Sequence, residues 1–426
     1  TSPIHGEVPE GWGVDKVKYL FSSGKGLSIT KADLLEEGLP VISYGQIHAK
    51  QNNGVTIKPE LLRYTDFKYQ KSNSSCIVNK YDFAFADTSE DYDGCGNCVY
   101  KRDDSLLFGG YHVVILHSLL NQDNRFYAYL FKSDEWRKQI RENASGVKVF
   151  SITQKNIMNA SIICPPFEVQ QQIADFLDSK CSEIDALIEN LRARMESAKE
   201  YKKAVITEAV TKGLNKDAKM KDSGIEWIGE IPENWSNSRI KYEIIPLQRT
   251  VKNNDLIVTC FRDGTVTTRQ NRREEGFTIS LTENGYQGVN VGDLVIHGMD
   301  AFAGAIGCSD SRGKITPVVH VCKTMGNNRF FMFLLRSMAM NDVLMSYSDG
   351  VRIRSSDYRN FNKLGKFSIA VPPVNEQSQI ADYLDFKCFE IDALLKNYED
   401  QISTLEEYKK SLIYEYVTGK KKVPAA

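Results

Sequence analysis

The sequence has few of the features that mark membrane proteins, metalloproteins or proteins that are basic throughout. No apolar run approaches the roughly 20 residues that a membrane-spanning helix needs, and no basic-then-apolar leader opens the chain. We therefore expect a cytoplasmic protein. The six histidines stand singly and the formal net charge is only −1, so we expect neither a catalytic histidine pair nor a uniformly positive surface.

The nine cysteines include one motif-like pair, Cys95-Gly96-Asn97-Cys98. A structural zinc site needs a second cysteine or histidine pair at a matched spacing, and none follows. We therefore expect a reduced loop at this place and no bound metal.

Motifs for nucleotide binding and methyl transfer are missing. A Walker A loop needs a glycine five residues before its Gly-Lys pair, but Tyr19 holds that position before Gly24-Lys25. An adenine-methylating site typically places Asn or Asp before Pro-Pro, where this chain has Cys164 and Val371. The sequence therefore predicts no catalytic centre, and a self-sufficient methyltransferase is the enzyme alternative that S-adenosylmethionine binding would test.

Two duplicated stretches organise the chain. Residues 165–211 and 372–418 match without a gap at a constant offset of 207, and 25 of their 47 paired positions are identical. A shorter piece around Trp12 returns around Trp235. The blocks between these repeats mix turns, short β-like runs and one helix, and only their tails match. The pattern predicts an α+β protein in which one fold occurs twice with two different surfaces.

Each long repeat is predicted to be a helix that follows a proline pair and ends at Gly213 or Gly419. Apolar residues recur every 3.5 positions on average, which indicates a coiled-coil seam. Lys180 and Lys387 are expected to interrupt this seam. The expected seam residues are Ile173, Leu177, Ile184, Leu187 and Leu191 in the first helix and Ile380, Leu384, Ile391, Leu394 and Leu405 in the second.

The order of the repeats predicts the topology. The first helix carries the chain from one block to the other, so the second must run back for the two seams to be buried together. We therefore expect two long antiparallel helices joining two related α/β domains in a cyclic, pseudo-two-fold arrangement. The expected segments are domains at 1–163 and 229–370, spacer helices at 164–214 and 371–421, and a linker at 215–228.

A polar segment follows a predicted strand in each block. Arginine can pair with guanine through two hydrogen bonds, asparagine and glutamine with adenine, and a threonine methyl can pack on thymine. Residues 245–370 also hold 16 Lys and Arg against 11 Asp and Glu. The predicted DNA-contacting residues are Tyr44, Gln46, His48, Lys50, Gln51, Asn52, Arg262, Thr265, Thr267, Arg269, Gln270, Asn271, Arg272 and Arg273. Two alternatives remain open: solvated polar loops, and a two-headed coiled-coil scaffold that binds proteins.

The stretch 220–235, both Gln-Ile-Ala-Asp helix starts and both Tyr-Lys-Lys helix ends carry a family likeness. In these motifs the sequence resembles the specificity subunits of type I restriction–modification systems. The resemblance implies two target recognition domains that each read half of a split double-stranded DNA sequence. It also implies a non-catalytic chain without a cofactor, two modification subunits that use S-adenosylmethionine to methylate adenine, and room for restriction subunits that use ATP and Mg. A methylation-only assembly is the alternative within the family.

Overall fold

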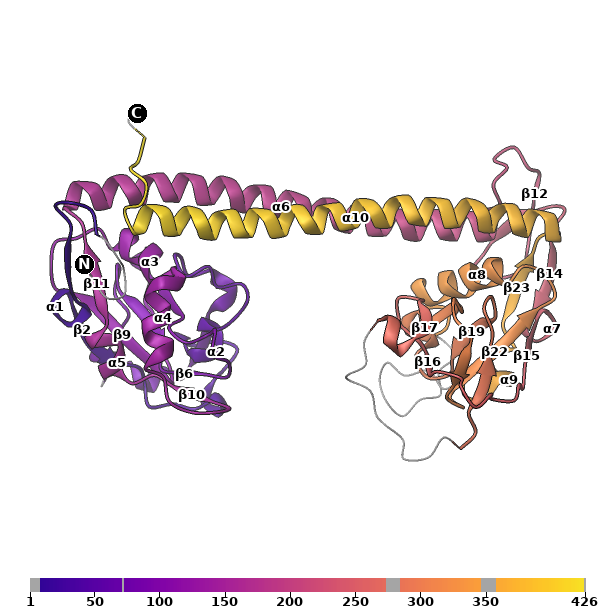
Figure 1. Cartoon of the computed structure of the whole chain (residues 1–426), viewed down its shortest axis with the longest axis horizontal. Helices are drawn as coiled ribbons and strands as arrows, with labels where there is room; N and C mark the ends of the chain where they lie inside the picture. Colours follow the sequence, from indigo (N-terminus) through magenta and orange to yellow (C-terminus); the bar gives the residue numbers. More distant parts are fainter. Residues whose placement is uncertain (1–7, 71–72, 273–283, 346–357, 425–426) are drawn as a thin grey trace. The chain divides into compact units, whose positions relative to one another are not determined.

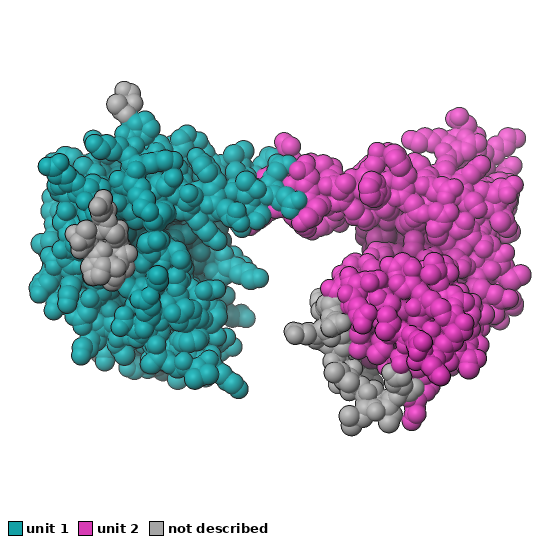
Figure 2. Space-filling model, in the orientation of Figure 1, with its two compact units in different colours: residues 1–190, 400–426 teal, residues 191–399 magenta. Residues whose placement is uncertain are grey.

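The computed structural model describes residues 8–70, 73–272, 284–345 and 358–424. The chain forms two compact units, residues 1–190 with 400–426 and residues 191–399 (Figure 2). Helices α6 (Phe167–Lys212) and α10 (Val374–Val417) are each divided between the units (Figure 1). Among the described residues, no helix is both long and apolar enough to cross a membrane.

Unit 1 is built on a four-stranded antiparallel sheet in the order β2-β9-β5-β7. Residues of β5 alternate between two apolar clusters: Phe83 and Phe85 face helices α3 and α4, while Ala84 and Ala86 join the cluster that holds Ile47. Its elements are β1 (Gly13–Lys16), α1 (Val17–Leu20), β2 (Phe21–Lys25), β3 (Leu39–Ile42), α2 (Tyr44–Ile47), β4 (Arg63–Thr65), β5 (Phe83–Ala86), β6 (Thr88–Ser89), β7 (Cys98–Tyr100), β8 (Phe108–Gly109), β9 (Val113–Ser118), α3 (Asn124–Lys132), α4 (Asp134–Glu142), β10 (Phe150–Ser151), α5 (Gln154–Asn159) and β11 (Ser161–Cys164).

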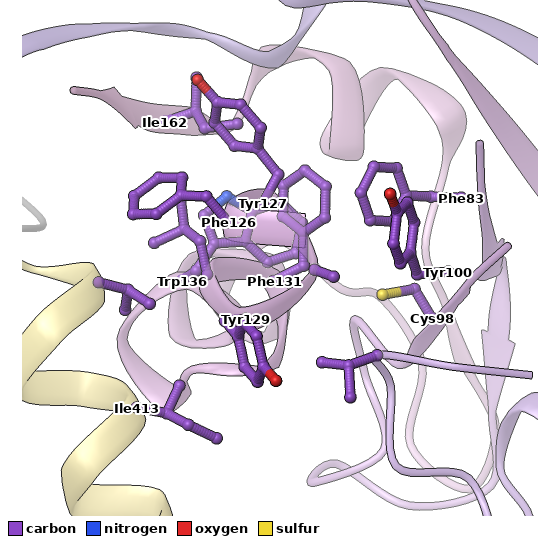
Figure 3. Packing of buried hydrophobic residues seen from close by; sticks show 14 of the residues in the cluster. Phe83, Cys98, Tyr100, Phe126, Tyr127, Tyr129, Phe131, Trp136, Ile162 and Ile413 are labelled. Carbon is purple, nitrogen blue, oxygen red and sulfur yellow. The ribbon is translucent and has the colours of Figure 1, made fainter. Parts of the chain in front are cut away.

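Helices α3 and α4 are separated at Ser133, where the apolar pattern alone suggests one continuous helix. Ser133 is extended, its hydroxyl donates to the Leu130 carbonyl, and the same oxygen accepts a hydrogen bond from the Trp136 backbone N–H. A serine in this position ends one helix and caps the next. The break brings Trp136 against Phe131, with ring centroids 4.5 Å apart, in the core that Ile413 of α10 borders (Figure 3).

Unit 2 repeats the same construction with the sheet order β15-β22-β19-β20. Its outer pair β14–β23 joins Ser236 to Val371, the counterparts of Gly13 and Cys164 in the pair β1–β11. The duplicated fold is thereby confirmed. Its elements are β12 (Met220–Asp222), β13 (Glu230–Pro232), β14 (Ser236–Arg239), α7 (Ile240–Glu243), β15 (Ile244–Pro246), β16 (Val258–Cys260), β17 (Val266–Thr268), β18 (Gln287–Val289), β19 (Leu294–His297), β20 (Ile306–Cys308), β21 (Gly313–Ile315), β22 (Val319–Thr324), α8 (Asn328–Met340), α9 (Phe361–Leu364) and β23 (Ser368–Val371).

The two long helices run antiparallel within each unit, as predicted. In unit 1, Phe176 stacks on Tyr416 with ring centroids 4.5 Å apart, and nine residues further along α6 Asp185 pairs with Lys409. Partner numbers thus fall along α10 as they rise along α6. In unit 2, Lys202 pairs with Asp392.

Two of the predicted seam positions are wrong. The predicted seam residues other than Leu187 and Leu394 are buried or half-buried. Leu187 and Leu394 are 55% and 41% exposed, whereas Ile188 is only 5% exposed. Neighbouring side chains on a helix point about 100° apart, so a choice that is wrong by one residue moves a side chain off the seam. The observed seam of α6 runs through positions 177, 181, 184, 188 and 191.

The expected polar interruptions of the seam also lie elsewhere. Cys181 and Cys388 hold the seam positions next to Lys180 and Lys387, and these lysines pair with glutamates on their own helices. The lysines that do lie on the seam are Lys202 and Lys409. We call their ion pairs, Lys409–Asp185 and Lys202–Asp392, the seam pairs; each Nζ–Oδ1 distance is 2.6 Å. Polar residues at seam positions specify helix register and orientation.

The ends of both helices rest on the repeated tryptophan turns. Gly213 and Gly419 have left-handed backbone angles, φ +75° and +73°. A Cβ atom at Gly213 would lie 3.3 Å from Trp235, and one at Gly419 would lie 3.0 Å from Trp12. Only glycine meets both demands, which explains why each helix ends there. The end of α10 therefore lies at the N-terminal tryptophan turn, as the repeat order predicts.

Candidate nucleic-acid interface

A matched arginine cluster joins each recognition domain to the long helices. Arg125, at the start of α3, donates to Asp175 at 2.6 Å and to Asp178 at 3.3 Å. Arg329, at the start of α8, donates to Asp382 at 2.6 Å and also pairs with Asp385. The arginines are 204 positions apart and the aspartates 207. Burial opposes ionisation of Asp178, but hydrogen bonds from Arg102 and Tyr129 outweigh it and lower the pKa of this carboxyl.

A buried glutamine completes each junction. Gln170 accepts a hydrogen bond from the Asp123 backbone N–H at 2.9 Å and donates to the Pro165 carbonyl at 2.8 Å. Gln377 makes the same pair of bonds, to Asn327 at 2.9 Å and to Pro372 at 2.9 Å. The proline pair that precedes each helix is thus tied to the start of a domain helix. Within each unit, the glutamine therefore fixes the start of the domain helix to the start of a long helix.

The recognition segment of unit 1, residues 44–54, follows β3. Three of its predicted DNA-contacting side chains hold the segment itself together. Gln46 accepts a hydrogen bond from the Ser43 N–H at 3.1 Å, and His48 Nε2 lies 2.8 Å from the Thr88 carbonyl. Asn52 donates to the carbonyls of Ile47 and Cys98 at 2.7 and 3.0 Å. Lys50 and Gln51 are exposed, so they remain available to a ligand.

The residue pattern did not predict an aromatic cluster that lies beside this segment. The half-buried Tyr44 ring lies 5.5 Å from both Tyr111 and His112, measured between ring centroids. His112 has a left-handed backbone, φ +56°, and its Nδ1 lies 3.0 Å from Asp87. Parallel pairing of β3 with β8 brings this distant turn to Tyr44. The visible signal was the Gly109-Gly110 turn before an apolar run.

The recognition segment of unit 2, residues 262–272, begins in the turn of the β16–β17 hairpin. The Arg272 guanidinium lies 4.2 Å from the centre of the Phe261 ring and 2.7 Å from Asp263. Exposed Arg262 donates to Asp300 at 2.9 Å. Burial would raise the pKa of Asp263, but hydrogen bonds from Arg272 and Thr265 hold it at about 2. The carboxylate therefore stays charged and orients Arg272.

Residues 9–197 match the family model described as the type I restriction modification DNA specificity domain. In this part the chain is similar to the DNA specificity domain of type I systems, and two curated specificity subunits are similar to it over about half of its length. It is 27% identical over 240 residues to the putative MjaX specificity subunit and 27% identical over 255 residues to the MjaVIII specificity subunit, both of Methanocaldococcus jannaschii. These alignments cover 54% and 58% of this chain and 52% of each relative, so the chain spans about half the length of the curated relatives it matches.

Two solved structures have a similar fold. A chain from a study of complex assembly and conformational transition of a type I restriction–modification system superposes with a TM-score of 0.69 at 14% identity. That match covers 97% of this chain and 100% of the other. The HsdS subunit from Thermoanaerobacter tengcongensis gives a TM-score of 0.51 at 13% identity, with 97% and 98% covered.

The remaining predicted contacts of this chain lie in unit 2. Thr267 is only 3% exposed and accepts a hydrogen bond from Asn271 at 2.9 Å, so its methyl faces the interior and the prediction of a thymine contact is wrong. Arg269 is half-buried and donates to Thr259. Thr265, Gln270 and Asn271 are exposed. Arg273 lies outside the described residues. DNA contact by the other candidates stays a prediction.

The cysteine pair Cys95 and Cys98 belongs to the core of unit 1. Cys95 and Cys98 are buried beneath the aromatic cluster of α3 and α4. Burial raises the pKa of Cys98 to about 12 and also raises the pKa of Cys95. Within the described ranges, no three His, Cys, Asp or Glu side chains come together in a way that could hold a metal ion.

Proposed function

We propose that this chain is the DNA sequence-specificity subunit of a type I restriction–modification system, and that each recognition segment reads one half of a bipartite target. The observation that carries the proposal is the contrast between the junctions and the segments. The arginine and glutamine contacts are the same in both units. The side chains exposed at the segments differ, as two halves of a split sequence require.

The two segments suit different bases. Unit 2 offers Arg262 and Arg272, both held by aspartates, and an oriented guanidinium pairs with guanine through two hydrogen bonds. Unit 1 has no arginine between residues 44 and 54 and offers Lys50, Gln51 and the Tyr44–His112 cluster. We therefore expect a guanine in the half-site of unit 2 and an adenine contact from Gln51 in the other.

The partners are modification subunits that dock on the long helices. Exposed apolar residues recur at equivalent positions outside the seam: Leu187 with Leu394, and Tyr201 with Tyr408. A solvated helix pair gains nothing from such residues, whereas a protein partner would bury them. The chain itself supplies no catalysis and binds no cofactor under this proposal. S-adenosylmethionine belongs to the modification subunits, and ATP with Mg to restriction subunits.

Methylation sequencing tests the reading of DNA. Genomes are compared after expression of the modification subunits with the wild-type chain, with Arg262→Ala/Arg272→Ala, or with Lys50→Ala/Gln51→Ala. We expect a split wild-type motif, with base preference lost only in the half-site of the altered unit. Each lost arginine–guanine pair should cost about 1–3 kcal/mol of discrimination. A single uninterrupted motif, or no sequence-dependent binding at all, contradicts the proposal, and the second result favours a protein scaffold.

Docking is tested separately with Leu187→Glu. This variant should lose co-purification with the modification subunits, whereas Leu35→Glu, at an exposed leucine away from the long helices, should keep it. Equal retention by both variants would contradict the docking surface. Cleavage of unmethylated plasmid by the complete assembly then distinguishes a restriction system from one that only methylates.

A further inference from the structure

A half-buried lysine supports the recognition segment of unit 1 from below. Lys132, the last residue of α3, donates through Nζ to the carbonyl oxygen of Asn53. The next residue, Gly54, has φ +78°, and a Cβ placed there would lie 3.5–3.8 Å from the aliphatic chain of Lys132. The turn at Gly54 therefore packs against the aliphatic chain of Lys132. Arg102 donates to the carbonyl oxygen of Val55, two residues after Asn53, at 2.8 Å.

Unit 2 contains the same device with arginine. Arg336 of α8 stands 204 positions after Lys132, the offset that relates Arg125 to Arg329. Its Nη1 donates to the carbonyl oxygen of Asp263. The next residue, Gly264, has φ +90°, and a Cβ placed there would overlap the Arg336 guanidinium. A cation, a carbonyl and a left-handed glycine thus recur in both units, although the segments themselves do not align.

Each supporting cation also lies within electrostatic range of a seam pair. Burial, and after it the charge of Lys409, lower the pKa of Lys132 to about 8, while Asp185 opposes them. In unit 2, burial lowers the pKa of Arg336, whereas Asp263 and Asp392 raise it. Asp392 belongs to the seam pair of Lys202. Lys132 is therefore related to Asn53 and to the Lys409–Asp185 pair as Arg336 is to Asp263 and to the Lys202–Asp392 pair.

We propose that Lys132 and Arg336 are positioning residues for DNA reading, each holding the turn of its own recognition segment in place. The inference rests on the proposed function and adds residues that do not touch DNA. Base-edge hydrogen bonds need donor–acceptor distances of about 2.7–3.2 Å, so a small shift of the turn changes which base fits.

The test uses the full chain assembled with its modification subunits. Lys132→Met and Arg336→Met are profiled on two DNA libraries, each randomised in one half-site, at saturating protein. Lys132→Met should reduce discrimination between matched and singly mismatched sites by at least about tenfold in the half-site of unit 1 alone, because one misread base pair carries roughly this factor. Arg336→Met should do so only in the other half-site. Lys138→Met, at an exposed lysine of α4, is the control and should leave both unchanged.

Conservative variants separate positioning from simple loss of folding. Lys132→Arg and Arg336→Lys keep a cation beneath the turn and should restore most of the discrimination. Hydrogen exchange should accelerate at residues 44–54 in Lys132→Met and at residues 262–272 in Arg336→Met, with the domain sheets unchanged. Ratios of matched to mismatched methylation report only folded complexes, so a lower yield does not alter the readout.

The outcomes separate the two proposals. A wild-type motif that is not split overturns the proposed function. A split wild-type motif with unaltered half-site preference in both methionine variants overturns the positioning role and leaves the proposed function standing. Equal relaxation of both half-sites by one variant would also overturn it, because the support is confined to its own unit.

Discussion

Neighbouring residues of α6 provide the sharpest test of the helix register. Ile188→Ala and Leu187→Ala remove the same number of carbon atoms from adjacent positions, but Ile188 is 5% exposed and Leu187 is 55% exposed. A core Ile→Ala substitution lowers the free energy of unfolding by about 2–5 kcal/mol. For Ile188→Ala we expect a value near 2 kcal/mol, because the seam lies between only two helices. Replacing an exposed leucine lowers the free energy of unfolding by about 0.5 kcal/mol or less. The difference between the variants should therefore be about 1.5 kcal/mol.

Urea unfolding of the whole chain, followed by circular dichroism, measures this difference. Because the two units can unfold in separate transitions, each curve is fitted with a transition for each unit, and only the one for unit 1 should shift. Leu395→Ala and Leu394→Ala repeat the comparison in unit 2, where Leu395 is half-buried and Leu394 is 41% exposed. A larger loss from Leu187→Ala than from Ile188→Ala would refute the observed seam and restore the one read from the sequence.

Two further predictions concern the junctions and the supporting lysine. Gln377→Leu and Gln170→Leu each leave a half-buried backbone N–H and a buried carbonyl without their partner, so each should lower the free energy of unfolding by about 2–4 kcal/mol, measured by denaturant titration. A loss below about 0.5 kcal/mol contradicts this. The pKa of Lys132 is about 8 in the folded chain against an ordinary 10.5, so between these values the unfolded chain binds the extra proton and folding gains stability as pH rises. Relative to Lys132→Met, the free energy of unfolding of the wild-type chain should rise by about 2 kcal/mol from pH 7 to 9.5. A difference between the two chains that does not change with pH in unfolding titrations would exclude the lowered pKa of Lys132.

The duplicated features of this chain could be read from the sequence because they recur at a constant offset. Arg125 and Arg329 stand in matching motifs, and so do the glutamines Gln170 and Gln377, although only the structure shows their partners. The antiparallel pairing followed from the order of the repeats. The seam prediction is wrong at Leu187 because Ile188 is also apolar. When two neighbouring residues are both apolar, the sequence does not show which side chain points into the seam.

The recognition surface was less accessible to sequence reasoning. His48 and Asn52 have suitable side chains for DNA, but their hydrogen bonds are used within the fold, which a local pattern does not reveal. Tyr111 and His112 reach Tyr44 through strand pairing between residues far apart in the chain. Thr267 alternates with its neighbours in a strand whose whole length is buried. Contacts between residues far apart in the chain therefore set the surroundings of these side chains.

The division of the long helices also sets an order of assembly during synthesis. Unit 2 is contiguous, residues 191–399, whereas unit 1 needs residues 400–426 to cover a core that includes Leu412, Ile413 and Tyr416. At about 5–20 residues per second, the ribosome needs roughly 10–40 s to make the intervening segment. Unit 1 is thus translated first but completes its core last. During that interval its apolar surface is open to chaperones, and a stalled ribosome would leave a nascent chain with a finished second half and an unfinished first.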